Sequence, residues 1–314
     1  MLFRSATDSD TDRVAAVVVD EPVGWIPADR YLDELRQRMY RPEWTWLAED
    51  EGQVVGRSLW WGQSTAEHPV DLDCLWVDAS VPDRAKVAAG LLAAGLESFT
   101  ARGAADLPIL TVKLTDGWRD DPAVSAAAEW RHDAALAAGL SHVVERLQLE
   151  WTAPAGLAAA GAPLSFPRAS DEEFLPVFRG IAEGSLDAGT RKDIAEVGAD
   201  AAARKAMDFY LDCLGERDWW RLAYDADGEV VGLAIPSATP YARNVGYIGV
   251  LPKFRGRGYV DEVLAEITRF QAAAGAERIT ATTDRGNVPM AAAFARAGYR
   301  ITEIRMVYSV PAAS

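Results

Sequence analysis

The chain has 314 residues, of which 49% are hydrophobic and 25% are charged, and its formal net charge is −15. Two domains of roughly 150 residues each are expected at this length, and the composition is globular rather than fibrous or disordered. The negative charge argues against nucleic acid as a partner, because phosphate binding needs clustered Lys and Arg. It would attract an amine substrate, although an acidic surface can also serve solubility alone.

Membrane, disulfide and metal signals are missing from the sequence. No apolar run approaches the roughly 18 residues that span a bilayer, and no signal segment precedes the first domain, so a cytoplasmic protein is expected. Cys74 and Cys213 lie far apart without a CxxC pattern, which favours reduced packing residues over a disulfide or zinc site. His68, His132 and His142 lack metal-ligand spacing, so no metal is expected.

The first half reads as alternating strands and helices. An acidic, glycine-containing turn between two apolar runs predicts a hairpin at 44–61. Apolar residues at helical spacing predict a helix from Val87 to Phe99. The full expected order is strand and helix in 3–18, hairpin 44–61, strand 71–79, helix 87–99, strand 107–114, helix 127–139 and strand 142–151.

The second half repeats this order, so one fold is used twice. Its hairpin has one extra residue in the turn, and Pro289 suits the first turn of its last helix. The uncharged segment 153–165, rich in Ala, Gly and Pro, reads as a linker. The matching elements are strand and helix in 166–178, hairpin 219–236, strand 245–252, helix 260–270, strand 277–283, helix 289–298 and strand 302–310. The sequence therefore predicts a tandem of two mixed α/β domains, 1–152 and 166–314.

A glycine-arginine loop follows the strand 245–252 and leads into a helix. Backbone amides of such a turn and the positive end of the next helix form an anion site suited to a pyrophosphate. Gly256 and Gly258 would let the backbone approach the phosphates, and Arg255 and Arg257 would add positive charge. Taken alone, the motif is equally compatible with a surface turn.

With its surroundings, the loop resembles the signature of the GNAT superfamily of acyl-CoA N-acyltransferases, Gln/Arg-x-x-Gly-x-Gly/Ala after the fourth strand. Here the motif reads Arg255-Gly256-Arg257-Gly258-Tyr259-Val260, with Val260 in place of the final small residue. A second signature of the family, an Asn leading into a helix that ends in Gly and an aromatic residue, is matched by Asn287 and by Gly298 with Tyr299. The resemblance spans residues 166–310.

The resemblance implies acetyl-CoA as cofactor, bound by the loop 255–260 and by two splayed strands. Val250 and Leu251 would offer free backbone groups to the pantetheine arm, which bonds like an added strand. Asn287 would contact the same arm or else cap its helix. Phe294 would lie beside the cofactor at the position where the family often has a proton-donating Tyr.

The first half looks like the same fold without its cofactor loop. The corresponding segment, 80–90, has no glycine pair and places Asp83 near the phosphate position. We expect that this domain does not bind acyl-CoA, and that it braces the second domain or walls its substrate cleft.

Four residues of the second half are candidates for the reaction, each with a structural alternative. Tyr247 and Asp284 are candidates for the base that takes the amine's proton, or else a strand packing residue and a turn cap. Glu183 and Asp187, in a predicted loop over the acceptor, would bind an ammonium group or else form a solvated acidic surface.

The leading hypothesis is an N-acetyltransferase for a primary amine of a small molecule, acting as a monomer or homodimer. The first alternative is a catalytically inert acyl-CoA-binding or sensing module, suggested by Phe294. The second is a specialised-metabolite acyltransferase resembling mycothiol synthase. The same scaffold serves many substrates, so the sequence leaves the acceptor open.

Overall fold

The computed structural model describes residues 1–157 and 164–311, and these form two compact units. The first unit consists of residues 1–145 and 304–311, and the second lies within residues 146–303. The expected linker, 153–165, falls partly outside the described residues. Each unit therefore contains residues from both halves of the sequence.

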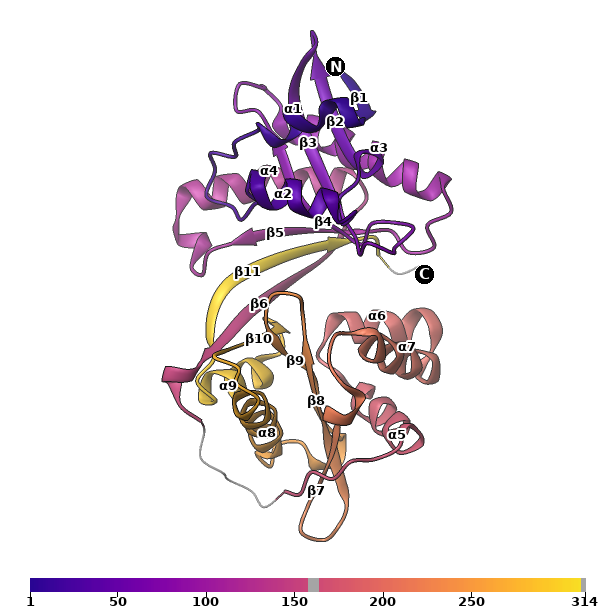
Figure 1. The fold of residues 1–314 in the computed structure, drawn as a ribbon, viewed down its shortest axis with the longest axis vertical. Helices are drawn as coiled ribbons and strands as arrows, with labels where there is room; N and C mark the ends of the chain where they lie inside the picture. Colours follow the sequence, from indigo (N-terminus) through magenta and orange to yellow (C-terminus); the bar gives the residue numbers. More distant parts are fainter. Residues whose placement is uncertain (158–163, 312–314) are drawn as a thin grey trace. The chain divides into compact units, whose positions relative to one another are not determined.

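The first unit is a mixed sheet with helices packed against it (Figure 1). Its elements are β1 (Leu2–Ser5), α1 (Thr11–Ala15), α2 (Ala28–Arg36), β2 (Thr45–Asp50), β3 (Gln53–Trp61), β4 (Asp71–Val77), α3 (Arg84–Ala101), β5 (Ile109–Leu114), α4 (Pro122–Ala137) and the end of β11 (Arg300–Ser309). The strand order is β1-β2-β3-β4-β5-β11, and only β4 and β5 run parallel.

The second unit repeats this arrangement. Its elements are the end of β6 (His142–Thr152), α5 (Asp171–Ala182), α6 (Ala188–Val197), α7 (Ala199–Asp212), β7 (Arg221–Tyr224), β8 (Val230–Ala238), β9 (Arg243–Val250), α8 (Tyr259–Ala273), β10 (Arg278–Asp284) and α9 (Val288–Arg296). The strand order is β7-β8-β9-β10-β6, and β9 and β10 run parallel. Figure 1 shows α8 and α9 on one face of this sheet and α5, α6 and α7 on the other.

The last strand of each half lies in the sheet of the other unit. Residues 304–308 of β11 pair with β5, and residues 146–152 of β6 pair with β10, both antiparallel. The domain boundary at residue 152 expected from the sequence therefore does not coincide with the compact units. Strand periodicity shows that a segment is extended but not which sheet it joins.

The internal repeat is confirmed, with local differences from the expected elements; α2 and most of α7 were not expected. Residues 166–178 were expected to begin with a strand, and this strand is reduced to one bridge in which Ser165 and Tyr224 exchange backbone hydrogen bonds of 2.9 Å. The segment around Asp187, expected as a loop, is the start of α6, because the Asp187 carboxylate accepts from the Thr190 amide at 2.7 Å.

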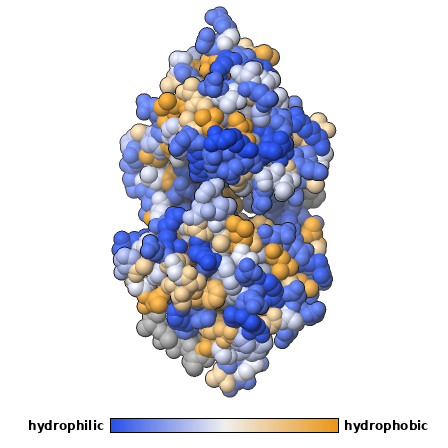
Figure 2. Space-filling view, in the orientation of Figure 1, coloured by the Kyte–Doolittle hydropathy of each residue, from blue (hydrophilic) through white to orange (hydrophobic). Residues whose placement is uncertain are grey.

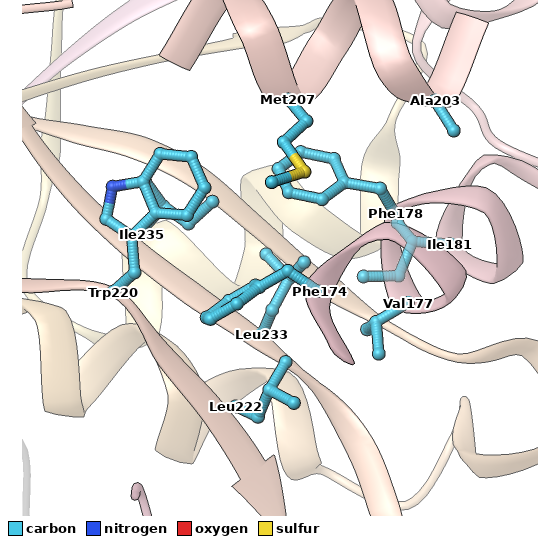
Figure 3. Packing of buried hydrophobic residues seen from close by; sticks show 10 residues of the cluster. All are labelled: Phe174, Val177, Phe178, Ile181, Ala203, Met207, Trp220, Leu222, Leu233 and Ile235. Atoms are coloured by element: carbon cyan, nitrogen blue, oxygen red, sulfur yellow. The ribbon is translucent and has the colours of Figure 1, made fainter. Parts of the chain in front are cut away.

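One buried cluster holds α5 and α7 against the sheet of the second unit (Figure 3). In Figure 3 the thioether of Met207, from α7, lies over the ring of Phe178, from α5. Burying each such side chain stabilises the fold by about 1.5–3 kcal/mol. The cluster consists of Phe174, Val177, Phe178, Ile181, Ala203, Met207, Trp220, Leu222, Leu233 and Ile235.

The surface in Figure 2 carries hydrophobic residues only in small patches between hydrophilic ones. Such scattered apolar residues are normal for a protein surface and indicate no docking face on this side. In the described ranges 1–157 and 164–311, no helix is long and apolar enough to cross a membrane.

Candidate active site

Strands β9 and β10 are hydrogen-bonded only where they begin. Their register pairs residues 243–244 with 279–280, and no further pairing between them is found in the described part of the chain. On its other edge β9 stays paired with β8 as far as Val250. A gap therefore opens between β9 and β10 toward their carboxyl ends.

The backbone of β9 presents polar groups to this gap. The Leu251 amide donates to the Val231 carbonyl at 2.9 Å, and the Leu251 carbonyl accepts from the Phe254 amide at 2.9 Å. Leu251 therefore does not offer the free backbone groups expected from the sequence. Because alternate residues of a strand direct their backbone groups to opposite neighbours, Ile248 and Val250 direct theirs into the gap. Ile248 takes the place that the sequence assigned to Leu251.

The turn between β9 and α8 presents a row of free amides. Gly256 and Gly258 have φ angles of +76° and +80°, and no protein atom lies within 4 Å of a Cβ built at either position. Among the described residues, the amides of 256–260 donate to no protein group, and the first to do so is that of Asp261, to the Gly258 carbonyl at 3.0 Å. Free amides at a helix start, with open space above them, form an anion site.

The two arginines of the turn have different roles. The Arg255 guanidinium donates to three carbonyls, those of Val250 at 3.1 Å, Ile181 at 2.8 Å and Gly184 at 3.2 Å. Its side chain therefore ties the turn to the end of β9 and to α5 rather than pointing at the anion site. Arg257 is exposed, with its guanidinium 5.4 Å from the centre of the Phe254 ring, and so can approach a bound phosphate.

A cavity of about 790 Å³ begins at this turn and passes through the gap between β9 and β10. A volume of this size is within the range of ligand sites. On the face of α8 and α9 it is lined by Gly256, Gly258, Tyr259, Val260, Asn287, Met290 and Phe294. On the face of α6 and α7 it is lined by Arg146, Asp187, Thr190, Asp193, Lys205, Phe209, Tyr210 and Tyr247.

Asn287 and Phe294 line the turn end of the cavity. Asn287 is the N-cap residue of α9, but its side chain makes no capping hydrogen bond. The amide side chain is thus not committed to the helix and lines the cavity. Phe294 is buried and packs edge-on against Tyr299 at 5.1 Å, so it contributes an apolar wall without a proton to give.

Tyr247 projects from β9 into an aromatic wall. Its ring stacks on Phe178 at 5.0 Å and lies tilted against Tyr210 at 5.4 Å. Burial, with the nearby Asp187 carboxylate, raises the pKa of Tyr247 well above its ordinary value. Burial also raises the pKa of Tyr210 in the same way. Both hydroxyls keep their protons at neutral pH, so Tyr247 is suited to donate a proton rather than to act as a base.

Asp284 lies behind the cavity and holds two elements together. One carboxylate oxygen accepts from the Ala188 amide at 2.6 Å, and the other lies 3.1 Å from the Arg146 Nε. Burial raises the pKa of Asp284, and the Ala188 amide offsets part of this rise. Asp284 is not among the residues that line the cavity. It therefore positions α6 and Arg146, which does not favour the role of base considered from the sequence.

The two acidic residues expected at the acceptor are separated by the structure. Asp187 lines the cavity, with its second oxygen 3.8 Å from the Arg146 Nη2. Glu183 is exposed at the end of α5 and does not line the cavity, so it does not support the expected contact with the acceptor. Arg146, Lys205 and Tyr210 were missed as site residues, because the sequence assigned Arg146 to the other domain and predicted neither α6 nor the part of α7 that carries Lys205.

The second unit contains a segment that matches a known protein family. Residues 194–299 match the model of the acetyltransferase (GNAT) family. The second unit is a GNAT domain. No curated protein matches the sequence.

Solved structures extend the GNAT fold to the whole chain. A GCN5-related N-acetyltransferase from Sphaerobacter thermophilus is 14% identical with a TM-score of 0.58, and the match covers 98% of this chain and 94% of that one. A tandem GNAT protein from the clavulanic acid biosynthesis pathway is 19% identical with a TM-score of 0.50, covering 100% and 99%. A glucosamine N-acetyltransferase region of a fungal β-N-acetylglucosaminidase is 16% identical with a TM-score of 0.56, covering 98% and 38%. The chain has the tandem GNAT fold.

The first GNAT-like unit has a similar gap, but its own residues fill it. Strands β4 and β5 pair only at residues 71–72 with 109–110. The Gly24 amide then donates to the Lys113 carbonyl at 2.8 Å, and the buried Arg131 donates to the Leu75 carbonyl at 3.2 Å. The space left there is a cavity of about 10 Å³, lined by Val19 and Val23 among others.

The helix that would receive a pyrophosphate in the first unit is already capped. The Asp83 carboxylate accepts from the Lys86 amide at 3.0 Å, at the start of α3. The neighbouring Arg84 is bound to Glu21 at 2.8 Å. Although burial raises it, the pKa of Glu21 is held below its ordinary value by Arg84 and Arg131. A carboxylate at this helix start would repel a diphosphate.

In the ranges 1–157 and 164–311, no group of three or more His, Cys, Asp or Glu side chains is arranged to hold a metal ion.

Proposed function

We propose that the second unit is an N-acetyltransferase that moves an acetyl group from acetyl-CoA to a primary amine of a small molecule. One observation carries the proposal. A single cavity begins at the free amides before α8 and passes through the gap between β9 and β10. It ends in an acidic and aromatic chamber, which is the part of the cavity on the face of α6 and α7. This arrangement suits a long donor that ends in a diphosphate and an acceptor that enters from the opposite face.

The residues at the turn fit the donor. The free amides of residues 256–260 and the exposed Arg257 supply donors and positive charge for the diphosphate. The Ile248 backbone groups and the Val250 amide, which face the gap, suit the amides of a pantetheine arm, while the Val250 carbonyl is held by Arg255. The Asn287 side chain provides a further polar contact, and Phe294 an apolar one.

Acetyl-CoA supplies an activated acyl group as a thioester. The amine nitrogen bonds to the acyl carbon, the carbon–sulfur bond breaks, and the sulfur leaves as a thiolate. Backbone amides of β9 that face the gap can stabilise the oxyanion. Tyr247, which keeps its proton, is placed in the cavity wall to protonate the thiolate, and the amine's proton passes to water.

Binding of acetyl-CoA to the variant Gly258→Glu tests the donor site. The added carboxylate lies among the amides that receive the diphosphate, so the dissociation constant for acetyl-CoA should rise by about 100-fold or more. Gly275→Glu is the matched control, since Gly275 also has a positive φ, of +87°, and open space, but at the opposite end of α8. Calorimetry should find near-normal affinity for the control. Retained affinity in Gly258→Glu would place the diphosphate elsewhere.

Release of free thiol from acetyl-CoA in the presence of a panel of amines tests the transfer itself. The proposal expects thiol and N-acetylated product in equal amounts with at least one amine. Binding without thiol release would favour the inert acyl-CoA-binding module. Mass increases of 42 Da on metabolite amines, about the mass of an added acetyl group, would identify the acceptor.

A further inference from the structure

Arg146 lines the cavity but has no role in the binding of the proposed donor. It lies on β6, the strand that the first half of the sequence contributes to the second unit, directly opposite Asp284 in the sheet. It lines the chamber on the face of α6 and α7. A guanidinium in an acceptor chamber is unexpected if the acceptor is a simple amine, because the two cations would repel each other.

The Arg146 guanidinium is held by two carboxylates on one side and faces the chamber on the other. Its Nε lies 3.1 Å from Asp284 and its Nη2 lies 3.8 Å from Asp187, while 37% of the side chain is exposed. The Nε is buried and has no hydrogen-bond acceptor with suitable geometry among the described residues. A guanidinium has five N–H donors in one plane, so donors remain for a ligand in the chamber.

We propose that the acceptor is an amine with a carboxylate on the neighbouring carbon, as in an α-amino acid, and that Arg146 binds this carboxylate. The inference rests on the proposed acetyl transfer. Arg146 presents positive charge beside the negative charge of Asp187, 3.8 Å apart. An α-amino acid carries its ammonium and carboxylate at a similar spacing, so each charge can face its opposite. Guanidinium and carboxylate also match in planar, bidentate geometry.

Other residues of the chamber agree with this charge pattern. Lys205 and Asp193 line the same chamber as an ion pair at 2.8 Å, so a second pair of opposite charges faces the acceptor. Phe209 and Tyr210 add aromatic surface for an apolar side chain. In the proposed step the α-nitrogen bonds to the acetyl carbon and the carbon–sulfur bond breaks. The nitrogen's proton passes to water and the thiolate is protonated, giving an N-acetyl amino acid and CoA.

Two matched series of acceptors test the inference. The first series is L-phenylalanine, L-phenylalaninamide and phenethylamine, and the second is the corresponding set built on L-leucine. Within each series the side chain and amine are kept while the carboxylate is neutralised or removed. With the unmodified protein, kcat/KM for at least one of the amino acids should exceed that of its amide and its decarboxylated amine by 10-fold or more. Equal or better use of the neutral amines in both series would overturn the inference.

The variant Arg146→Gln should then remove the preference. Its kcat/KM for the amino acid should fall by about 10- to 100-fold, mainly through KM, as expected for a lost charged hydrogen bond. The decarboxylated amine should change by less than 3-fold. Arg204→Gln is the control for net charge, because Arg204 is exposed on α7 and does not line the cavity. An equal loss on all acceptors would mean that Arg146 only stabilises the fold.

Two measurements separate the proposed role of Arg146 from the proposed acetyl transfer: binding of acetyl-CoA and binding of the amino acid. If acetyl-CoA binds but no amino acid is acetylated, the inference falls while the donor site remains. If acetyl-CoA does not bind, calorimetric titration with L-phenylalanine and L-leucine still tests Arg146. Binding that is lost in Arg146→Gln and kept in Arg204→Gln supports the inference, and absence of binding to the unmodified protein overturns it.

Discussion

At the residue scale, two aromatic positions bear on the protonation of the leaving thiolate. Phe294 is buried beside the turn and has no proton to give, whereas Tyr247 reaches the cavity from β9 with its proton retained. From the sequence Tyr247 was a candidate base, and we propose it instead as a proton donor. Burial decides the direction, because it disfavours the charged phenolate.

The variant Tyr247→Phe tests this assignment. If Tyr247 protonates the leaving thiolate, kcat should fall by about 10- to 100-fold while the dissociation constant for acetyl-CoA stays unchanged. Because its pKa is raised, kcat of the unmodified protein should show no decline from loss of this proton up to about pH 10, the ordinary value for tyrosine. Tyr224→Phe is the control, since Tyr224 packs against the core without lining the cavity. Full activity in Tyr247→Phe together with a loss in Tyr210→Phe would give the role to Tyr210.

The glycines of the turn 255–260 could be interpreted from the sequence, whereas the contacts of its two arginines could be predicted only in part. Glycine at positions 256 and 258 is required by the positive φ angles, so its function is visible in the sequence. An arginine side chain is long, and its target depends on elements far away in the chain. Arg255 bonds to Ile181 and Gly184, which lie more than 70 residues earlier, and local sequence carries no trace of this contact.

At the element scale, the sequence predicts most strands and helices of both halves, but it misses α2, α6 and most of α7, and it does not predict the exchange of β6 and β11. Alternating apolar residues identify an extended segment, and the two last strands occupy equivalent places in equivalent sheets. Judged by the pattern of apolar residues alone, β6 and β11 could each pair with either β5 or β10. The exchange matters for the site, because it brings Arg146 into the second unit.

Ending the chain at Glu303 tests the exchange. The first unit would lose the partner of β5, since residues 304–308 pair with 110–114. Amides of β5 that bond to β11 should then exchange hydrogen about 100-fold faster or more, because an edge strand opens more easily. A chain ending at Ser309 keeps the whole of β11 and should behave as the unmodified protein. Unchanged protection of β5 in the shorter chain would contradict the pairing.

At the scale of the whole molecule, one fold is used twice, and the two gaps differ in what fills them. The sequence indicated this difference through the missing glycines and Asp83. It did not show that Gly24 and Arg131 bond to the strands on either side of the first gap, because these contacts join segments that are distant in sequence. The expectation that the first unit binds no acyl-CoA therefore rests on two independent features, a capped helix and a filled gap.

The number of acetyl-CoA molecules bound per chain tests this division of labour. We expect calorimetry to give one site per chain for the unmodified protein and for Asp83→Asn, because the first gap stays filled by Gly24 and Arg131 whatever occupies the start of α3. Gly258→Glu should leave no site, and Gly275→Glu should leave one. Two sites in the unmodified protein, or one remaining in Gly258→Glu, would mean that the first unit opens its gap to acetyl-CoA. Opening would break the hydrogen bond from the buried Arg131 to the Leu75 carbonyl at 3.2 Å, and leaving such a buried donor unpaired costs about 1–3 kcal/mol. That cost is why a single site is expected.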